Sequence, residues 1–504
     1  MKFINTYLLF TLFVFLMSCT QEQILEDSFS ENLEKTQQQE LMSVDEINKI
    51  IDASLKSTGT FNWNQVTDQV LWSAVVHGDK VLTIGYGQKG EHFRSPQNQR
   101  LTQTKNDIIQ QVFNLEEEGK TEMHVRAHEI LNTLDISVKN FETISALRQR
   151  NDIRYLEPNG YSFFHNEAFP QNQKSSSGCG FDGEALNQND YKRIRPDALR
   201  SWTIFKPRIH KAWNTTTGQG VTVGLIDTGV SENQPLLGSN FNDGYSSGRS
   251  IEKFGTFVDS IWWWSDNYDG PNDKCGHGTS MASTLAAPRN DDYLPVGVAY
   301  NCNLVSYRAS EDVVLDDYHE KRGVTEALVA LADRTDVNII SMSVGYPWSI
   351  GNVEDAVIYA HSQGKLIFAA GGTSTEITNW YPVIFPANMD ECIAVTGITD
   401  YNGYQQCDTC HTGSEIEFTV VMERENNNNR TGTVLGFYEG DTNYVGGSSV
   451  ATATVAGIAT LVWSKFPNLT REEVLDRMRQ ASHFYPNKDS EYGYGNIQAF
   501  HAVQ

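Results

Sequence analysis

The feature that most constrains the fold is a series of apolar runs in the second half of the chain. From Gly220 onward these runs alternate with segments of helical pattern. The runs cover residues 221–226, 303–307, 337–342, 365–370 and 392–395. Helical segments include 325–332 and 353–362, and Gly364 ends the second. Continuous apolar strands separated by helices are buried on both faces, so the pattern predicts an α/β fold with a parallel sheet flanked by helices.

A smaller unit of mixed pattern precedes this region, at residues 42–159. Residues 70–86 are expected to form two strands around a turn. Further along, Ile108, Val112 and Leu115 lie on one face of a predicted helix. Strand, helix and strand patterns then follow at 134–138, 141–148 and 153–156. We therefore expect a small α+β domain here.

A polar connector joins the two units. Residues 160–200 include Pro170, a Gln-rich patch and three consecutive serines, and this composition is typical of a linker. Exposed linkers are also where proteolytic cleavage concentrates. We place the larger α/β domain at residues 201–504.

Three Gly-rich segments of the larger domain each present one reactive side chain. Asp227 ends a buried strand and begins Asp-Thr-Gly, and His277 is the centre of Gly-His-Gly at the start of a helix. Ser448 and Ser449 follow Gly-Gly at the start of an apolar helix. A serine hydroxyl is a poor nucleophile unless a histidine takes its proton, and a carboxylate holds the imidazole in one tautomer. The three side chains together predict amide hydrolysis.

These segments resemble the signatures of subtilisin-like serine proteases, the subtilase family, in the family's order of Asp, His and Ser. The resemblance covers roughly residues 202–503. It implies that Asp227 orients the imidazole and that His277 is the general base. Counting back from the following Val-Ala-Gly puts Ser449 at the nucleophile's position and Ser448 at the family's usual threonine. The implied function is a serine endopeptidase that hydrolyses proteins through an acyl-enzyme.

The small domain at 42–159 resembles the propeptide of such proteases. It ends in strand, helix and strand, directly upstream of the catalytic domain. The resemblance implies an inhibitory propeptide, and a precursor that cleaves itself between about residues 160 and 177. The region 160–200 is then both a linker and a processing region.

A further segment, Ser343-Val344-Gly345, resembles the family strand that pairs with the substrate backbone, where a glycine lets the substrate approach closely. At the oxyanion site the chain departs from the family. The usual asparagine is replaced by Gly372, which Thr373 follows. Losing such a donor costs about 3–4 kcal/mol of transition-state stabilisation, a value measured on subtilisin itself. Thr373, or another group of the altered loop, is expected to substitute if the enzyme is active.

The resemblance implies no required cofactor, and it leaves a structural calcium open. Leu236 stands where one common calcium site has an aspartate, which argues against that site. The stretch Asn290-Asp291-Asp292 nevertheless resembles the other half of that site.

The tryptophan run 262–264 lies beside Asp266, Asp269 and Asp273. Three interpretations are open for it: packing beneath an insertion, an aromatic platform for substrate, or a calcium loop. We favour packing.

The N-terminus predicts export. Lys2 precedes an apolar run at residues 7–17, which is too short to span a bilayer as a stable helix. The following Leu-Met-Ser-Cys19 resembles the cleavage box of a bacterial lipoprotein signal. Residues 1–19 are then a signal peptide, Cys19 carries lipid, and residues 20–41 form a polar tether. The expected location is the cell envelope, at the outer membrane or cell surface. An ordinary secretory signal is the alternative.

The remaining cysteines predict disulfide bonds, since an even number in an oxidising compartment is typical of them. They are Cys179, Cys275, Cys302, Cys392, Cys407 and Cys410. Their pairing is not fixed by the sequence. Cys407 and Cys410 have the spacing of a redox or metal pair, but no second such motif accompanies them, which favours a structural disulfide.

The charge balance limits the partners. With 39 basic and 63 acidic residues the net charge is −24, which excludes nucleic acid because phosphate binding needs a basic face. Expected partners are polypeptide substrates, the chain's own propeptide, and a membrane through the lipid. The alternative function is a catalytically impaired, protease-like protein that binds other molecules at the cell surface, and Gly372 is the residue that favours it.

Four acidic residues follow the strand at 303–307: Glu311, Asp312, Asp316 and Asp317. They predict either a solvated acidic loop or a preference for Lys or Arg two to four residues before the scissile bond.

Overall fold

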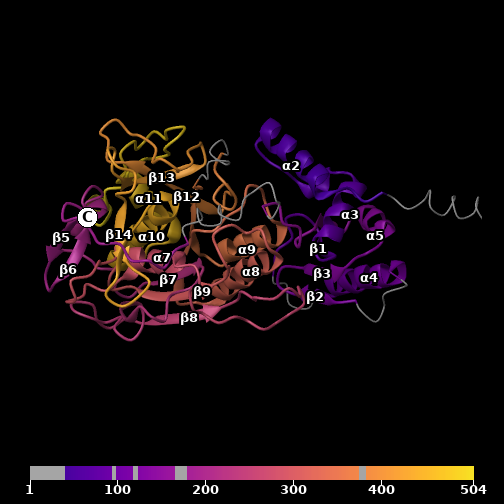
Figure 1. Cartoon of the computed structure of the whole chain (residues 1–504), viewed down its shortest axis with the longest axis horizontal. Coiled ribbons are helices and arrows are strands. Elements are labelled where there is room, and N and C mark those ends of the chain that lie inside the picture. Colours follow the sequence, from indigo (N-terminus) through magenta and orange to yellow (C-terminus); the bar gives the residue numbers. More distant parts are fainter. Residues whose placement is uncertain (1–39, 94–97, 117–122, 165–178, 374–381) are drawn as a thin grey trace, which may run out of the picture.

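The computed structural model describes residues 40–93, 98–116, 123–164, 179–373 and 382–504. The expected signal peptide, Cys19, nearly all of the tether, and residues 165–178 of the processing region lie outside these residues. The described chain forms an α+β unit (residues 40–164) beside a larger α/β unit (residues 179–504), as Figure 1 shows in indigo and in magenta to yellow.

The α+β unit is built on an antiparallel sheet of four strands in the order β2-β3-β1-β4. Its strands are β1 (Val81–Tyr86), β2 (Val125–His128), β3 (Thr133–Ser137) and β4 (Ile153–Glu157). Its helices are α2 (Val44–Thr58), α3 (Asp68–His77), α4 (Gln99–Leu115) and α5 (Phe141–Arg148). The predicted elements from residue 107 onward are confirmed.

The predicted strand before the turn at 77–79 is wrong, because those residues form α3. The helix buries Val70, Leu71, Ala74 and Val75, and spacings of one and four residues are typical of one helical face. The Thr67 hydroxyl caps its first turn, accepting from the backbone N–H of Val70 at 3.4 Å.

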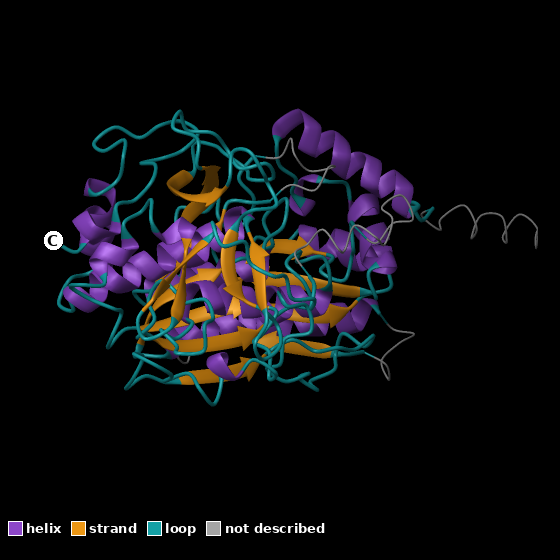
Figure 2. Ribbon diagram, turned by 60° about the vertical axis from the view of Figure 1, so that its left-hand side comes forward, coloured by secondary structure: helices purple, strands orange, loops and turns teal. Residues whose placement is uncertain are grey.

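The α/β unit is built on a parallel sheet of seven strands in the order β13-β12-β11-β10-β7-β9-β8, which confirms the predicted fold class. Its strands are β7 (Thr222–Asp227), β8 (Ile251–Gly255), β9 (Asn303–Arg308), β10 (Val337–Met342), β11 (Leu366–Ala370), β12 (Cys392–Thr399) and β13 (Ile416–Glu423). Its helices are α6 (Ile209–Ala212), α7 (His277–Ala286), α8 (Tyr318–Asp333), α9 (Gly351–Ser362), α10 (Gly447–Lys465), α11 (Arg471–Gln480) and α12 (Ala499–Ala502). Figure 2 shows the orange strands among the purple helices.

Neighbouring residues of the central strands point into two different cores, as the alternation of a strand requires. Ile339 and Phe368 pack in one core with residues of α7 and α10. Their neighbours Ile340 and Ile367 pack in the other core with residues of α8 and α9. Within the described residues, α10 is long and apolar enough to cross a membrane by length and composition, yet it lies largely buried in the first core.

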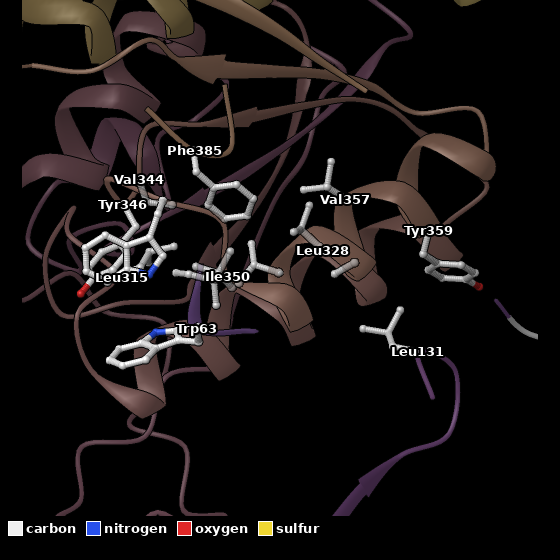
Figure 3. Close-up of a cluster of buried hydrophobic side chains, with 14 of the residues drawn as sticks. Trp63, Leu131, Leu315, Leu328, Val344, Tyr346, Ile350, Val357, Tyr359 and Phe385 are labelled. Atoms are coloured by element: carbon white, nitrogen blue, oxygen red, sulfur yellow. The ribbon is translucent and has the colours of Figure 1, made fainter. Parts of the chain in front are cut away.

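The second core continues into the α+β unit. Trp63 and Leu131 of the α+β unit belong to the same cluster of buried side chains as Leu315, Tyr346 and Ile350 of the α/β unit (Figure 3). The two units therefore share one continuous hydrophobic core.

Two hairpins complete the α/β unit, β5 (Tyr191–Ile194) with β6 (Ala198–Ser201), and β14 (Gly432–Leu435) with β15 (Thr442–Val445). The first hairpin lies within the stretch expected to be linker. Leu199 N–H donates to Leu294 O at 2.8 Å, and the buried Asp190 accepts from Arg430 at 2.6 and 2.7 Å. The ordered α/β unit therefore begins before residue 201.

Candidate active site

Asp227 and His277 meet at the carboxyl edge of the parallel sheet. Asp227 is the last residue of β7, and His277 is the first residue of α7. The Nδ1 atom of His277 lies 2.7 Å from Oδ1 of Asp227, and the two residues are 4% and 0% exposed. A neutral imidazole that donates from Nδ1 has an unprotonated Nε2, which is the acceptor that a general base needs.

The glycines of the two motifs let the segments approach this closely. A Cβ on Gly278 would lie 2.2 Å from the carbonyl oxygen of Gly229, so no larger residue fits there. Gly276 has a φ of 95°, and a Cβ on it would lie 2.3 Å from Gly180 O. The first contact joins Asp-Thr-Gly to Gly-His-Gly, and the second joins Gly-His-Gly to the segment at Gly180.

Asp273 holds the turn in front of His277. Its Oδ1 accepts from the backbone N–H groups of Cys275 and Gly276 at 2.9 and 2.8 Å. Its Oδ2 accepts from the N–H of Thr279 at 2.9 Å and from the hydroxyl of Thr279 at 2.6 Å. The Thr228 hydroxyl, next to Asp227, also donates to Asp273 at 2.9 Å. One carboxylate therefore ties the acid's strand to the histidine's helix.

The electrostatics of this pair favour a charged imidazole. Burial alone would lower the pKa of His277, but the Asp227 carboxylate, with help from Asp273 and Asp312, raises it above the ordinary value of 6.5. The positive charge that a general base acquires when it takes a proton is thus stabilised in place.

The structure separates the two adjacent serines. Both lie in the first turn of α10, which packs against α7. Ser448 is buried, and its Oγ accepts from the N–H of Gly372 at 3.2 Å. Ser449 is half-buried, and its carbonyl oxygen accepts from the Ser343 hydroxyl at 3.2 Å. Ser448 is therefore occupied with the loop after β11.

The segment Ser343–Gly345 follows β10 directly. The N–H of Gly345 donates to Val313 O at 3.0 Å, and its carbonyl accepts from Leu315 N–H at 3.1 Å. A Cβ on Gly345 would lie 2.7 Å from Phe385 O. In this state the chain's own residues 313–315 pair with the edge at Gly345.

The acidic stretch after β9 is largely built into the fold. Asp316 is buried and accepts from the N–H groups of Phe163 and Phe164 at 2.8 and 3.0 Å. It also accepts from the Tyr346 hydroxyl at 2.7 Å. Asp317 caps α8. The interpretation as a solvated loop is therefore wrong for Asp316, which binds the end of the α+β unit.

Buried polar contacts join the α+β unit to α8 and α9. Arg154 donates to both oxygens of Asp355 at 2.6 and 2.7 Å, and both side chains are nearly buried. Glu157 accepts from the N–H of Gly351 at 2.8 Å, and burial raises its pKa to about 8. Lys321 donates to Asn159 O at 2.9 Å.

The tryptophan run packs against the α+β unit, which confirms the packing interpretation. Trp263 is buried with Val81 and Tyr318. Trp264 stacks on His124 with ring centroids 3.8 Å apart, and only Trp262 is largely exposed.

The carboxylates beside the run already bind protein donors. Asp266 pairs with Arg126 and Arg322, and Asp269 pairs with Lys274 and Arg308. Asp273 holds the turn before His277, as described above. These contacts argue against a calcium loop at the tryptophan run.

Two disulfides are present among the described cysteines. Cys179 is bonded to Cys275, two residues before His277, and Cys407 is bonded to Cys410, so a disulfide is present at that motif. Cys302 and Cys392 are buried thiols, so the expectation that every remaining cysteine is paired is wrong.

One acidic cluster could hold a cation. Side-chain oxygens of Asp243, Asp291 and Asp292 lie within 4.8 Å of one another. Burial and the two neighbouring carboxylates raise the pKa of Asp292. Asn290 is buried and bonds the backbone of its own loop, and Leu236 is buried as a core residue.

Two residues near the site were missed by sequence reasoning. Asp273 is named above only beside the tryptophan run, although an acid placed three residues before Gly-His-Gly is a usable signal. His411 lies against Gly372, where a Cβ would be 2.4 Å from its Nδ1. Nothing in the sequence links these two positions, which are 39 residues apart.

Several proteins of similar sequence align with much of this chain. The minor extracellular protease Epr of Bacillus subtilis (strain 168) is 26% identical over 368 residues, which are 71% of this chain and 47% of that protein. The thermophilic serine proteinase of Bacillus sp. (strain AK1) is 26% identical over 380 residues, 73% of this chain and 77% of that protein. The chain thus spans about half the length of the first of these relatives.

Subtilisin E of Bacillus subtilis (strain 168) is 28% identical over 285 residues, 56% of this chain and 66% of that protein. Among solved structures, MycP1 from Mycobacterium smegmatis is similar with a TM-score of 0.48 and 22% identity, over 65% of this chain and 88% of that chain. The model of the subtilase family (Peptidase_S8) matches residues 218–495, which contain Asp227, His277 and Ser449. The chain therefore belongs to the subtilase family.

Proposed function

We propose that this protein is a serine endopeptidase in which Asp227, His277 and Ser449 form the catalytic triad. Ser449 attacks the scissile carbonyl, and Nε2 of His277 takes its proton and later gives it to the leaving amine. Asp227 holds the imidazole in the required tautomer. The resulting acyl-enzyme is hydrolysed by water, which regenerates Ser449.

The observation that carries this proposal is the 2.7 Å contact between the buried Asp227 and His277, at the start of a helix that packs on the helix bearing Ser449. The raised pKa of His277 suits a base that must bear a charge during the reaction. The hydroxyl of Ser448 accepts from Gly372 N–H, which supports Ser449 as the nucleophile.

The proposed substrate segment is Ser343–Gly345, with the substrate chain lying along this edge. Residues 313–315 occupy Gly345 in the present state, so pairing there requires this segment to exchange with the substrate. The hydrogen bond from Ser343 to Ser449 O ties the segment to the nucleophile's own backbone.

The α+β unit is proposed to be a propeptide that the enzyme removes itself. It binds through the buried Arg154–Asp355 pair and through Asp316, which lies beside Tyr346. The next described residue is Cys179, which is bonded to Cys275 close to His277. The fourteen residues between these anchors, 165–178, include the proposed cleavage region.

Export and lipid anchoring at Cys19 complete the proposal. The pattern at residues 7–19 supports both, and the relative Epr is described as extracellular, which agrees with export. Incorporation of labelled palmitate into the wild type but not into Cys19→Ala would be the expected result. Equal label in both proteins would contradict the anchor.

The test of the triad is covalent labelling with a fluorophosphonate probe. Wild type and Ser448→Ala should label, whereas Ser449→Ala should not, because only an activated serine reacts. If wild type does not label, the alternative of an impaired binding protein is favoured.

The test of self-processing compares chain lengths on a blot. Ser449→Ala should accumulate the full precursor, while wild type and Ser448→Ala should give the shorter form. Equal lengths in all three proteins would contradict self-processing.

A further inference from the structure

The loop after β11 has no room for the asparagine that the family uses at the oxyanion. Gly372 has a φ of 123°, which L side chains rarely adopt, and the ring of His411 occupies the position of its Cβ, at 2.4 Å. A side-chain donor at 372 is therefore excluded by the fold. If the proposed function is correct, the second donor must come from another residue.

His411 itself is a poor candidate. Its Nδ1 lies 3.1 Å from Pro382 O, a carbonyl that can only accept, so the ring proton is on Nδ1. Burial lowers the pKa of His411, which keeps the imidazole neutral and leaves Nε2 as an acceptor. An acceptor repels an oxyanion.

Thr373 lies next to the helix that carries Ser449, and its hydroxyl proton is directed by its neighbours. Gly372 N–H donates to Ser448 Oγ at 3.2 Å, and the hydroxyl oxygens of Ser448 and Thr373 lie 3.0 Å apart, a pair in which either can donate. With Ser448 as the donor, Thr373 Oγ1 accepts this bond. Ser448 N–H also donates to Thr373 Oγ1, at 3.3 Å. An oxygen that accepts two bonds has its own proton left for a third partner.

The third partner of the Thr373 hydroxyl must approach from solvent, because the protein covers its other side. Thr373 is exposed, whereas Ser448 is buried. Gly447, with a φ of 75°, makes room for the hydroxyl, because a Cβ there would lie 2.9 Å from Thr373 Oγ1. The first N–H groups of α10, including that of Ser449, have no partner within the helix. They form the positive end of the helix dipole, which lies beside Thr373.

We propose that Thr373 donates its hydroxyl proton as the second hydrogen bond to the oxyanion, beside the backbone N–H of Ser449. The bond forms as the carbonyl oxygen gains charge, and no proton is transferred. This inference rests on the proposed function, because it assigns a donor for the same reaction.

The segment at Cys410 and His411 positions Thr373. Cys410 forms an antiparallel bridge with Thr373, and His411 N–H donates to Gly372 O at 3.0 Å. His411 O accepts from the Thr396 hydroxyl at 2.6 Å, which fixes it to β12. The Cys407–Cys410 disulfide closes the turn that leads into this segment.

The test compares Thr373→Val, which removes the hydroxyl at constant shape, with Thr373→Ser, which keeps it. Thr373→Val should lower kcat about 100- to 1,000-fold with KM nearly unchanged, the loss measured for one oxyanion donor in subtilisin. Thr373→Ser should keep at least a tenth of wild-type kcat. A peptide boronic acid, whose tetrahedral adduct places an oxygen at the oxyanion position, should lose affinity for Thr373→Val by a similar factor.

Unchanged kcat and boronic acid affinity in Thr373→Val would overturn the inference. A loss of kcat accompanied by a lower Tm, and equal in Thr373→Ser, would also overturn it, since that indicates a structural role. Fluorophosphonate labelling separates this failure from failure of the proposed function. If wild type labels and Ser449→Ala does not, the triad stands whatever Thr373 does.

Discussion

The two halves of the proposed active site are held in place by different means. The acid and imidazole half, with Asp227, His277 and Asp273, is buried and fixed by close glycine contacts and a fully bonded carboxylate. The hydroxyl half, with Ser448 and Thr373, lies at the helix start and is fixed by a few side-chain bonds to an exposed residue.

This difference predicts that substitutions in the two halves have different effects. Replacing a residue in the first half leaves a buried charge or donor without a partner, which costs stability as well as activity. In the second half only Thr373 is exposed, and Gly372 stands where the family has asparagine, with His411 in the space of its Cβ. Breaking each half should therefore give a different signature.

The largest expected effect is in the first half. Asp227→Asn should lower kcat about 10,000-fold, because the amide can no longer hold the imidazole in the required tautomer. Steady-state kinetics on a peptide substrate would measure it, with circular dichroism as the control for folding. A loss of less than ten-fold would mean that Asp227 does not orient the base.

Removing the two disulfides one at a time should have different effects: one removal should lower stability, and the other should lower catalysis. Cys179 and Cys275 are 96 residues apart, and closing a loop of that length stabilises by about 4–5 kcal/mol. The double variant to serine at these positions should lose most of that free energy of unfolding.

The Cys407–Cys410 loop is only three residues long in sequence separation. Serine at both of these positions should change Tm little and lower kcat about ten-fold, because the segment that bridges Thr373 loosens. Denaturant titration and kinetics on both double variants provide the comparison. If the variant at 407 and 410 lost more stability than the variant at 179 and 275, our assignment of stability to the first disulfide and catalysis to the second would be wrong.

Asp273→Asn should lower the free energy of unfolding by about 2–4 kcal/mol, since one amide nitrogen would face N–H donors in a buried position. Asp336→Asn is the matched control. Asp336 pairs with Arg334 at the surface and should contribute less than 1 kcal/mol. Equal losses in the two variants would show that Asp273 does not hold the turn.

The smallest change is in the pH profile. His277 must be neutral to act as a base, and its raised pKa places the acid limb of kcat/KM above pH 6.5. Asp227→Asn should move this limb to lower pH, whereas Thr373→Val should leave it in place. The charged pair also stabilises the fold fully below the unfolded pKa of 6.5 and loses this effect as pH rises through the folded value. A limb that stays in place in Asp227→Asn would contradict the coupling.

Sequence reasoning worked where a local pattern carries the information. The parallel sheet and the strand and helix positions of Asp227 and His277 follow from apolar runs and glycine spacing. It failed at α3, because residues 70–75 are apolar enough for a strand or a helix. The Thr67 cap is what favours the helix. It could not find His411 at Gly372, since that contact depends on how β12 and the following turn pack.

If the enzyme matures by cleavage as proposed, the Cys179–Cys275 bond has a consequence for its lifetime. A cut anywhere in residues 165–178 leaves at most thirteen residues ahead of Cys179 at the new end. An aminopeptidase trimming that end should stop at Cys179, because the disulfide bonds Cys179 to Cys275 in the folded domain and Gly180 N–H donates to Cys275 O at 2.8 Å. The enzyme's new terminus would thus be protected from degradation beside its own histidine.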